Sequence, residues 1–277
     1  GAAVLGRKGL VPGHGIERGA LRLAQAVELG ALLGGQAEAV GDRARDEARD
    51  DHAGGGEEES WELTLLFDAE WINRQLYRGL YSRTQSFFER SVLSSSASPA
   101  SPLELALLGN DAGEVDPDIL AGSFRQPQSD GSGFDRKNLR TAFALLKDAG
   151  FALDGGVMKE VATGSPLAFS AIAVAEDDER LFIPFIQSLK KAGIALDFRR
   201  LDSASYQSRV TKFDFDIIPF TYVSSLSPGN EQRFRWLSAS ADAEGSFNYA
   251  GVKSPAVDRM LEKLLAATTS EDFTAAV

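Results

Sequence analysis

Cysteine is absent from this sequence of 277 residues, and histidine occurs only at positions 14 and 52. The missing cysteines exclude a disulfide framework, a thiolate nucleophile and a Cys-ligated metal centre. Basic residues are in the minority, with 29 Lys and Arg against 40 Asp and Glu, which gives a formal charge of -11. We expect no nucleic-acid partner, because that function requires a basic face to neutralise phosphates. No apolar run approaches the ~20 residues of a membrane span.

Aromatic residues are missing from the first 60 positions, and all 17 Phe, 3 Trp and 5 Tyr lie from Trp61 onward. The first 60 positions also hold 13 of the 27 glycines. Such a segment cannot bury enough apolar area to offset the conformational entropy lost on folding. We expect residues 1–60 to be disordered or weakly helical. An alternative is that they are not native to the domain, as when a GC-rich gene is read out of frame. The spacing of His14 and His52 matches no metal-ligand pattern.

Helix boundaries are clearly marked from Trp61 onward. Asp68 is a good N-cap for a helix that runs to about Tyr77. The segment Ser101-Pro102-Leu103-Glu104 has the form of a capping box with proline at the first helical position. Asp116-Pro117 repeats the combination of a cap and a proline. These signals predict short helices separated by exposed loops.

Strands and helices alternate in the second half of the chain. The expected elements are a helix over 135–150, strands over 167–174, 194–198 and 215–220, and helices over 178–192 and after Asp202. Pro184 is expected either to kink the helix that contains it or to be its first residue. The order strand, helix, strand, helix, strand predicts a right-handed βαβαβ unit with a largely parallel sheet. The chain therefore belongs to the α/β class.

No regular pattern is visible between the third strand and a final helix capped by Ser254-Pro255. Connections of this length are uncommon unless they serve function, and ligands of open α/β sheets bind beyond the carboxyl ends of the strands. The pattern therefore predicts a ligand site within residues 222–249. An alternative interpretation is that Phe234, Trp236 and Phe247 simply pack this loop against the domain.

Catalytic motifs are absent as well. The sequence has no P-loop, dinucleotide-binding glycine motif, zincin motif or nucleophile elbow. No His or Cys follows residue 60, so the usual general base and nucleophile are missing. The carboxylates of Asp214 and Asp216, and those of residues 176–179, are interpreted as structural. We expect no enzymatic activity, no metal and no cofactor.

Six separated segments agree in order and spacing with a known family. They read FDAEWINRQLYRGLYSRTQSFF (67–88), NLRTAFALLKDAGF (138–151), GSPLAFSAI (164–172), KKAGIALDFRRLDSASYQSRVTKFDFDII (190–218), SSLSPGNEQRFRW (224–236) and NYAGVKSPAVDRML (248–261). Over residues 61–277 the chain resembles the family 5 extracellular solute-binding proteins of ABC importers. Within that family it most resembles the branch of oligopeptide- and microcin C-binding proteins of Gram-negative bacteria.

The resemblance implies one lobe of a two-lobed periplasmic binding protein. Such a receptor is a monomer that closes around a peptide or peptide-like solute and delivers it to an inner-membrane ABC permease. Family members are much longer, so we expect this chain to be a truncated part of a receptor. Two alternatives remain open, namely a small α/β enzyme such as a hydrolase and a fragment that binds nothing.

The resemblance also implies where the ligand binds. Much of the family carries an Asp-Pro element in the loop after the third strand, with its acid near the peptide amino terminus. Here residues 224–231 read SSLSPGNE, so that acid is not in place. The candidate ligand-binding residues of this loop are Tyr222, Ser224, Ser225, Leu226, Ser227, Asn230, Glu231 and Trp236. A second candidate segment, residues 81–88, contributes Tyr81 and Gln85, while its Phe87 and Phe88 fit a core role equally well.

Overall fold

The structure is a computed structural model that describes residues 2–5, 63–95, 97–221 and 225–277. Its first elements are β1 (Ala2–Leu5), α2 (Ala69–Tyr77), α3 (Pro102–Leu108), the 3₁₀ helix η3 (Gly109–Glu114), α4 (Pro117–Leu120), α5 (Arg136–Asp148), β2 (Phe151–Asp154) and β3 (Val157–Glu160). They are followed by β4 (Ala168–Ala173), α6 (Glu176–Lys191), β5 (Ala195–Arg200), α7 (Ser203–Thr211), β6 (Ile217–Phe220), α8 (Glu231–Trp236), the 3₁₀ helix η4 (Ser238–Ser240), α9 (Pro255–Ala266) and α10 (Ser270–Ala276).

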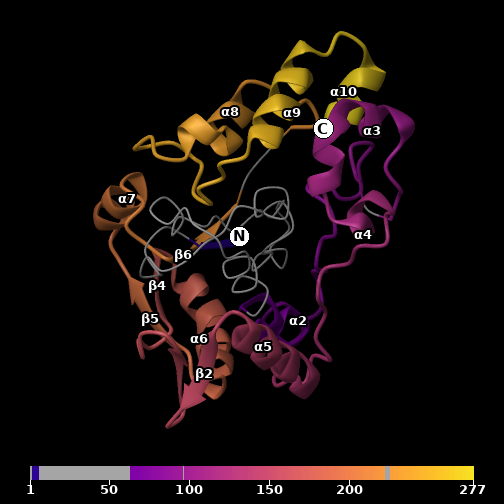
Figure 1. Ribbon diagram of the computed structural model, residues 1–277. Coiled ribbons are helices and arrows are strands. Elements are labelled where there is room, and N and C mark those ends of the chain that lie inside the picture. The colour runs from indigo at the N-terminus through magenta and orange to yellow at the C-terminus, as the bar shows by residue number, and fades with distance from the viewer. Residues whose placement is uncertain (1, 6–62, 96, 222–224) are drawn as a thin grey trace.

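A four-stranded sheet in the order β1-β6-β4-β5 organises one end of the molecule (Figure 1). Strand β4 runs parallel to both β5 and β6, and β1 pairs antiparallel with β6. The predicted succession of β4, α6, β5, α7 and β6 in a parallel sheet is confirmed. Strand β5 forms one edge of this sheet. The sequence did not predict β1, and the remainder of the segment proposed as disordered, residues 6–60, lies outside the described residues.

The two faces of the sheet belong to two different hydrophobic cores. Ala171 of β4 is paired with Ile217 of β6, and both side chains belong to the larger core. The next residue on each strand, Ile172 and Ile218, belongs to the smaller core. Because successive side chains of a strand point to opposite faces, the sheet separates the two cores. This burial on both faces is typical of a central parallel strand.

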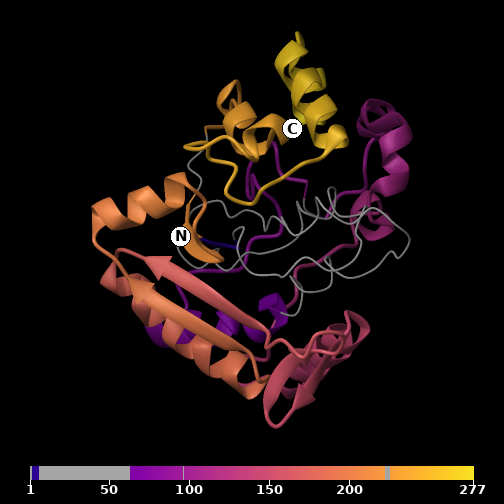
Figure 2. The same ribbon diagram turned by 60° about the vertical axis from the view of Figure 1, so that its left-hand side comes forward.

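Helices α2, α5 and α6 cover the face of the larger core. Phe182, Phe185 and Leu189 of α6 are almost fully buried there, and the ring of Phe185 meets Phe67 edge-on at 5.4 Å. Ala142 and Leu146 of α5 complete the helix face that the sequence predicts. Figure 2 shows α6 lying along one face of the sheet.

The predicted helix starts are confirmed by their hydrogen bonds. Asp68 accepts a bond from the Trp71 amide, and Asp202 accepts bonds from the second and third residues of α7. Ser101 and Glu104 form the full capping box. A proline occupies the first turn of α4 after Asp116. Local side-chain chemistry therefore fixes where these helices begin.

One of the two alternatives for Pro184 is excluded, and one hairpin was not predicted. Pro184 lies inside α6, which begins eight residues earlier, so it is not the first residue of that helix. The hairpin of β2 and β3 was not predicted, although Gly155 and Gly156 at its turn both have positive φ. Two consecutive glycines between residues of strand character are a recognised hairpin signal.

The hairpin lies directly against Gly193, at the end of α6. Gly193 has φ +76°, and a β-carbon there would lie 2.8 Å from the Met158 amide nitrogen and 3.0 Å from the Gly156 carbonyl oxygen. The Met158 amide also donates to the Gly193 carbonyl at 2.9 Å. Only a residue without a side chain permits this approach.

We expect Gly193→Ala to lower the free energy of unfolding by about 2–4 kcal/mol, which combines left-handed strain with a steric clash. Gly164→Ala is the matched control, because Gly164 has φ +73° but open space around its missing β-carbon. The control should cost only about 1–2 kcal/mol of strain. Urea denaturation of both variants measures the difference, and equal losses would show that the close approach of the hairpin contributes nothing.

A helical group formed by α3, α9 and α10 lies at the other end of the molecule (Figure 1). Within the described part of the chain, we find no helix whose length and apolar character would let it cross a bilayer.

Candidate functional site

The candidate loop leaves the sheet at the carboxyl end of β6 and leads into α8. Ser225, Leu226 and Ser227 are exposed, and the Ser225 hydroxyl accepts a hydrogen bond from the Ser227 amide at 3.2 Å. Tyr222 and Ser224 lie outside the described residues. The exposed part of the loop therefore presents hydroxyl groups and one large aliphatic side chain.

Asn248 holds the end of this loop in place. Its side chain is fully buried, and its amide nitrogen donates to the carbonyls of Leu237 and Val252 at 3.2 and 2.9 Å. Its carboxamide oxygen accepts from the Val252 amide at 2.8 Å. One side chain thus satisfies three backbone groups in the interior, which fixes the path of residues 237–252.

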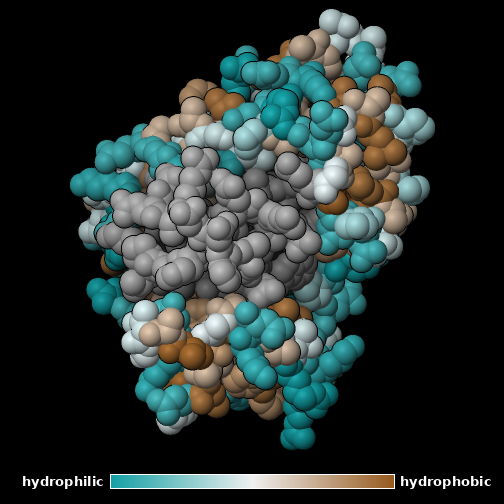
Figure 3. Space-filling model, in the orientation of Figure 1, coloured by the Kyte–Doolittle hydropathy of each residue, from teal (hydrophilic) through white to brown (hydrophobic). Residues whose placement is uncertain are grey.

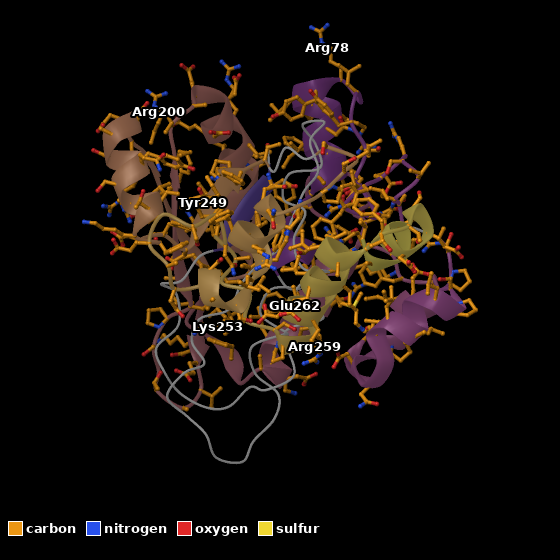
Figure 4. All side chains as sticks on the ribbon, turned by 90° about the horizontal axis from the view of Figure 1, so that it is seen from above. Arg78, Arg200, Tyr249, Lys253, Arg259 and Glu262 are labelled. Atoms are coloured by element: carbon orange, nitrogen blue, oxygen red, sulfur yellow. The ribbon has the colours of Figure 1, made fainter. Side chains whose placement is uncertain are left out.

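Tyr249 anchors the same stretch to the smaller core. Its ring lies at the centre of an aromatic group and meets Phe220, the last residue of β6, at 4.7 Å. The rings of Phe213 and Phe215 also meet it edge-on, at 6.3 Å each. Burial raises the pKa of Tyr249, so its hydroxyl stays protonated. Figure 4 shows Tyr249 inside the fold, which gives it a structural role.

A chain of polar contacts runs along α8. Glu231 accepts hydrogen bonds from the Gly229 amide at 2.8 Å and from the Gln232 side chain at 3.1 Å. Gln232 in turn accepts from the Trp236 indole nitrogen at 2.9 Å. Burial acts to raise the pKa of Glu231, but these hydrogen bonds outweigh it and the pKa is lowered. The Glu231 carboxylate therefore stays ionised and is already engaged in holding its own loop.

The aromatic residues of the loop divide into two kinds. Trp236 is half-buried and packs on the smaller core. Phe234 is 60% exposed, and Phe247 is 49% exposed although its ring also meets the buried ring of Tyr249 edge-on at 6.0 Å. Phe247 therefore packs in part against the domain, as the alternative interpretation expects, while Phe234 is the more exposed of the two. The Phe247 amide donates to the Phe234 carbonyl at 3.1 Å, which places the two residues next to each other. Hydrophobic residues also come to the surface over α8 in Figure 3.

The second candidate segment reaches the loop through Phe87. The Phe87 ring meets Trp236 at 6.0 Å, so the two segments named from the sequence are brought together. Tyr81 instead packs against the larger core and meets Tyr77 edge-on at 5.2 Å. The Gln85 side-chain oxygen accepts from the Gln126 amide at 2.8 Å. Tyr81 and Gln85 therefore have structural partners, and Phe87 is the residue that makes the connection.

The arrangement suits binding better than acid–base chemistry. Asn230 is exposed, and its side chain makes no capping bond to α8. Asp216 accepts from the Ser170 amide and hydroxyl at 2.7 Å, and Asp214 lies 3.3 Å from Arg209. The described residues contain no group of three or more His, Cys, Asp or Glu that could hold a metal ion. Hydroxyls, a carboxamide and exposed apolar side chains are the usual lining of a small-ligand site.

Residues 63–244 match the model of the bacterial extracellular solute-binding proteins, family 5 (middle region). The chain belongs to this family. The expected family resemblance is confirmed. The alternating α/β order of residues 168–220 lies within the matched region, as does the connection after β6 up to residue 244.

Two curated relatives of this family 5 protein come from Agrobacterium fabrum. The peptidoglycan-binding protein YepA is 44% identical over 78% of this chain and 35% of its own length. The probable peptide-binding protein YejA is 38% identical over 77% of this chain and 35% of its own length. The chain thus spans about a third of the length of these relatives.

A solved structure supports the fold of this family 5 protein. The mannohexaose-bound periplasmic oligopeptide-binding protein of an ABC transporter from Thermotoga maritima matches with a TM-score of 0.56 at 14% identity. The match covers 79% of this chain and 37% of that one. The fold is therefore that of one lobe of a two-lobed periplasmic binding protein, as the sequence predicts.

Proposed function

We propose that this chain is the ligand-binding lobe of a periplasmic substrate-binding component that binds peptides for import by an ABC transporter. The observation that carries the proposal is that one connection exposes the apolar side chains of Leu226, Phe234 and Phe247 together with the polar residues Ser225, Ser227 and Asn230. A bound peptide offers both backbone groups for hydrogen bonds and side chains for apolar contact. Closure of a second lobe over this surface would exclude water and strengthen those bonds.

The two relatives support a narrower ligand class. One relative is named for binding peptidoglycan and the other for binding peptides. Short peptides, including those released from peptidoglycan, are a ligand class that agrees with both names. We propose them as the ligands of the receptor that carries this sequence. The ligand sites include Ser225, Leu226, Ser227, Asn230 and the Phe87–Trp236 contact. Tyr222 and Ser224 remain candidates.

The proposal has further features, which are supported by membership of the family. The receptor acts without catalysis, works in the periplasm as a monomer and passes its ligand to an inner-membrane permease. We also propose that the family lobe begins near residue 61, after a segment that does not contribute to binding.

Isothermal titration calorimetry tests the proposed function. The natural protein that carries this sequence is titrated with a mixed library of tri- to pentapeptides and with peptides released from peptidoglycan. We expect heat of binding at micromolar peptide and no hydrolysis product. Hydrolysed peptide would favour an enzyme, and the absence of heat with every peptide would refute the proposal.

Phe234→Ala should weaken the peptide affinity about tenfold, because burial of an aromatic side chain contributes about 1.5–3 kcal/mol and 1.4 kcal/mol is a factor of ten. Asn230→Ala should weaken it about two- to tenfold through the loss of one hydrogen bond. Ile183→Ala on α6 is the control, since Ile183 is similarly exposed but lies on another element. Unchanged affinity in both loop variants would remove this loop from the site.

A further inference from the structure

Helix α3 is apolar except at Glu104, whose carboxylate closes the capping box at the start of the helix. Its sequence PLELALL places Leu or Ala at positions 103, 105, 106, 107 and 108. Successive residues of an α-helix are 100° apart, so these five positions surround the helix axis. A helix that is hydrophobic all round is normally found buried. Its sequence therefore predicts cover on most sides.

The structure supplies only part of that cover, since Leu103, Leu107 and Leu108 are half-buried. None of the residues of α3 is buried, and Leu105 is 41% exposed. The neighbouring helices α4 and α10 also contain no buried residue. A seven-residue helix is not stable by itself in water, because short helices depend on tertiary packing. Helices α3, α4 and α10 therefore contribute no residue to either of the two hydrophobic cores.

Polar contacts join α3 and the 3₁₀ helix η3 to α9. Arg259 of α9 forms a bidentate ion pair with Asp111 of η3, the 3₁₀ helix that directly follows α3, and one of its bonds is 2.9 Å long. Lys263 of α9 donates to the Leu107 carbonyl. Figure 4 shows Arg259 between α9 and α3. These contacts hold the C-terminal end of α3 against α9, and the side chain of Leu105 remains exposed to solvent.

A hydrophobic patch lies over α3 and α4 on the surface seen in Figure 3. Ile119 and Leu120 of α4 add to the leucines of α3; Leu105 is exposed, and the others are half-buried. We call the apolar residues of α3 and α4 the α3–α4 face. Contiguous apolar patches on soluble proteins mark interaction sites.

We propose that the α3–α4 face is a permanent interface, covered by an apolar element from the part of the receptor that this chain does not represent. The chain spans about a third of the length of its relatives, so a large part of a receptor has no counterpart here. Permanent interfaces resemble a domain core cut in half, which is the character of this face. A transient partner such as the permease meets a more polar surface.

The absence of cysteine allows a direct test with single thiols. Leu105→Cys and the control Ile183→Cys are introduced both into the 277-residue chain and into the natural receptor that carries it. The rate of maleimide labelling is then measured. We expect labelling at position 105 to be at least tenfold slower in the receptor than in the chain. Labelling at position 183, which is 53% exposed on α6, should differ less than twofold.

Three results would overturn the proposal. Equal labelling rates at position 105 would show that the face stays open in the receptor. Protection that appears only as the protein concentration rises, with a doubled mass by light scattering, would assign the face to a second copy. Protection that requires phosphatidylglycerol vesicles would assign it to a membrane. Hydrogen–deuterium exchange over residues 102–108 of the unsubstituted proteins gives the same comparison if Leu105→Cys does not fold.

Discussion

Phe185→Ala should lower the free energy of unfolding by about 3–5 kcal/mol, the range for deleting a buried aromatic side chain. Phe185 is 1% exposed in the centre of α6 and packs edge-on against Phe67 at 5.4 Å. The variant loses both the apolar area and the aromatic pair, and it leaves a cavity between α6 and the residues before α2. The measurement is urea denaturation of the chain, followed by circular dichroism.

The same residue type offers a control at an exposed position. Phe234 is 60% exposed on α8, so Phe234→Ala should change the free energy of unfolding by less than about 1 kcal/mol. The two substitutions should therefore act on different properties, with Phe185→Ala affecting stability and Phe234→Ala affecting peptide affinity. A loss of stability as large for Phe234→Ala as for Phe185→Ala would contradict the exposure of the α8 surface.

Asn248→Ala should cost about 2–4 kcal/mol, because it leaves three buried backbone groups without their partner. The carbonyls of Leu237 and Val252 and the Val252 amide all bond to this one side chain. Asn248→Asp should be at least as harmful. It retains the acceptor for the Val252 amide but removes both donors and adds a charge in the interior.

Asn230→Ala is the matched control for stability, since Asn230 is exposed and makes no capping bond. It should shift the free energy of unfolding by no more than about 0.5 kcal/mol. Denaturation of the three variants gives the ranking. If Asn248→Asp proved as stable as the unsubstituted chain, residues 237–252 would have to follow a different path.

The parts of the fold that follow from local chemistry could be predicted from the sequence. The parallel arrangement of β4, β5 and β6 follows from alternating hydrophobic periods, and helix starts follow from caps such as Asp202 and Ser101. Helix α8 was missed, because six residues are too few to show a helical period. The hairpin of β2 and β3 was missed although its Gly155-Gly156 turn carried a usable signal.

The candidate site was predicted less completely than the fold. The sequence places the loop at the end of β6, since that follows from the order of the elements. It does not reveal that Phe234 and Phe247 face outward while Trp236 packs inward. That difference depends on contacts with Phe87 and on hydrogen bonds such as the one from the Trp236 indole to Gln232. Such contacts join residues far apart in the sequence or depend on the final path of the loop.

The outer edge of β5 has a consequence for a protein proposed to bind extended peptides. An unpaired strand edge offers a row of backbone donors and acceptors that any extended chain can join. On β5 the residues Asp197 and Arg199 are exposed and form an ion pair at 2.6 Å, and Arg200 beside them is exposed as well. Charges placed this way discourage strand addition. These charges therefore disfavour the addition of an extended peptide to the edge of the sheet. Under the proposed function, the loop after β6 then binds peptides without competition from backbone pairing at β5.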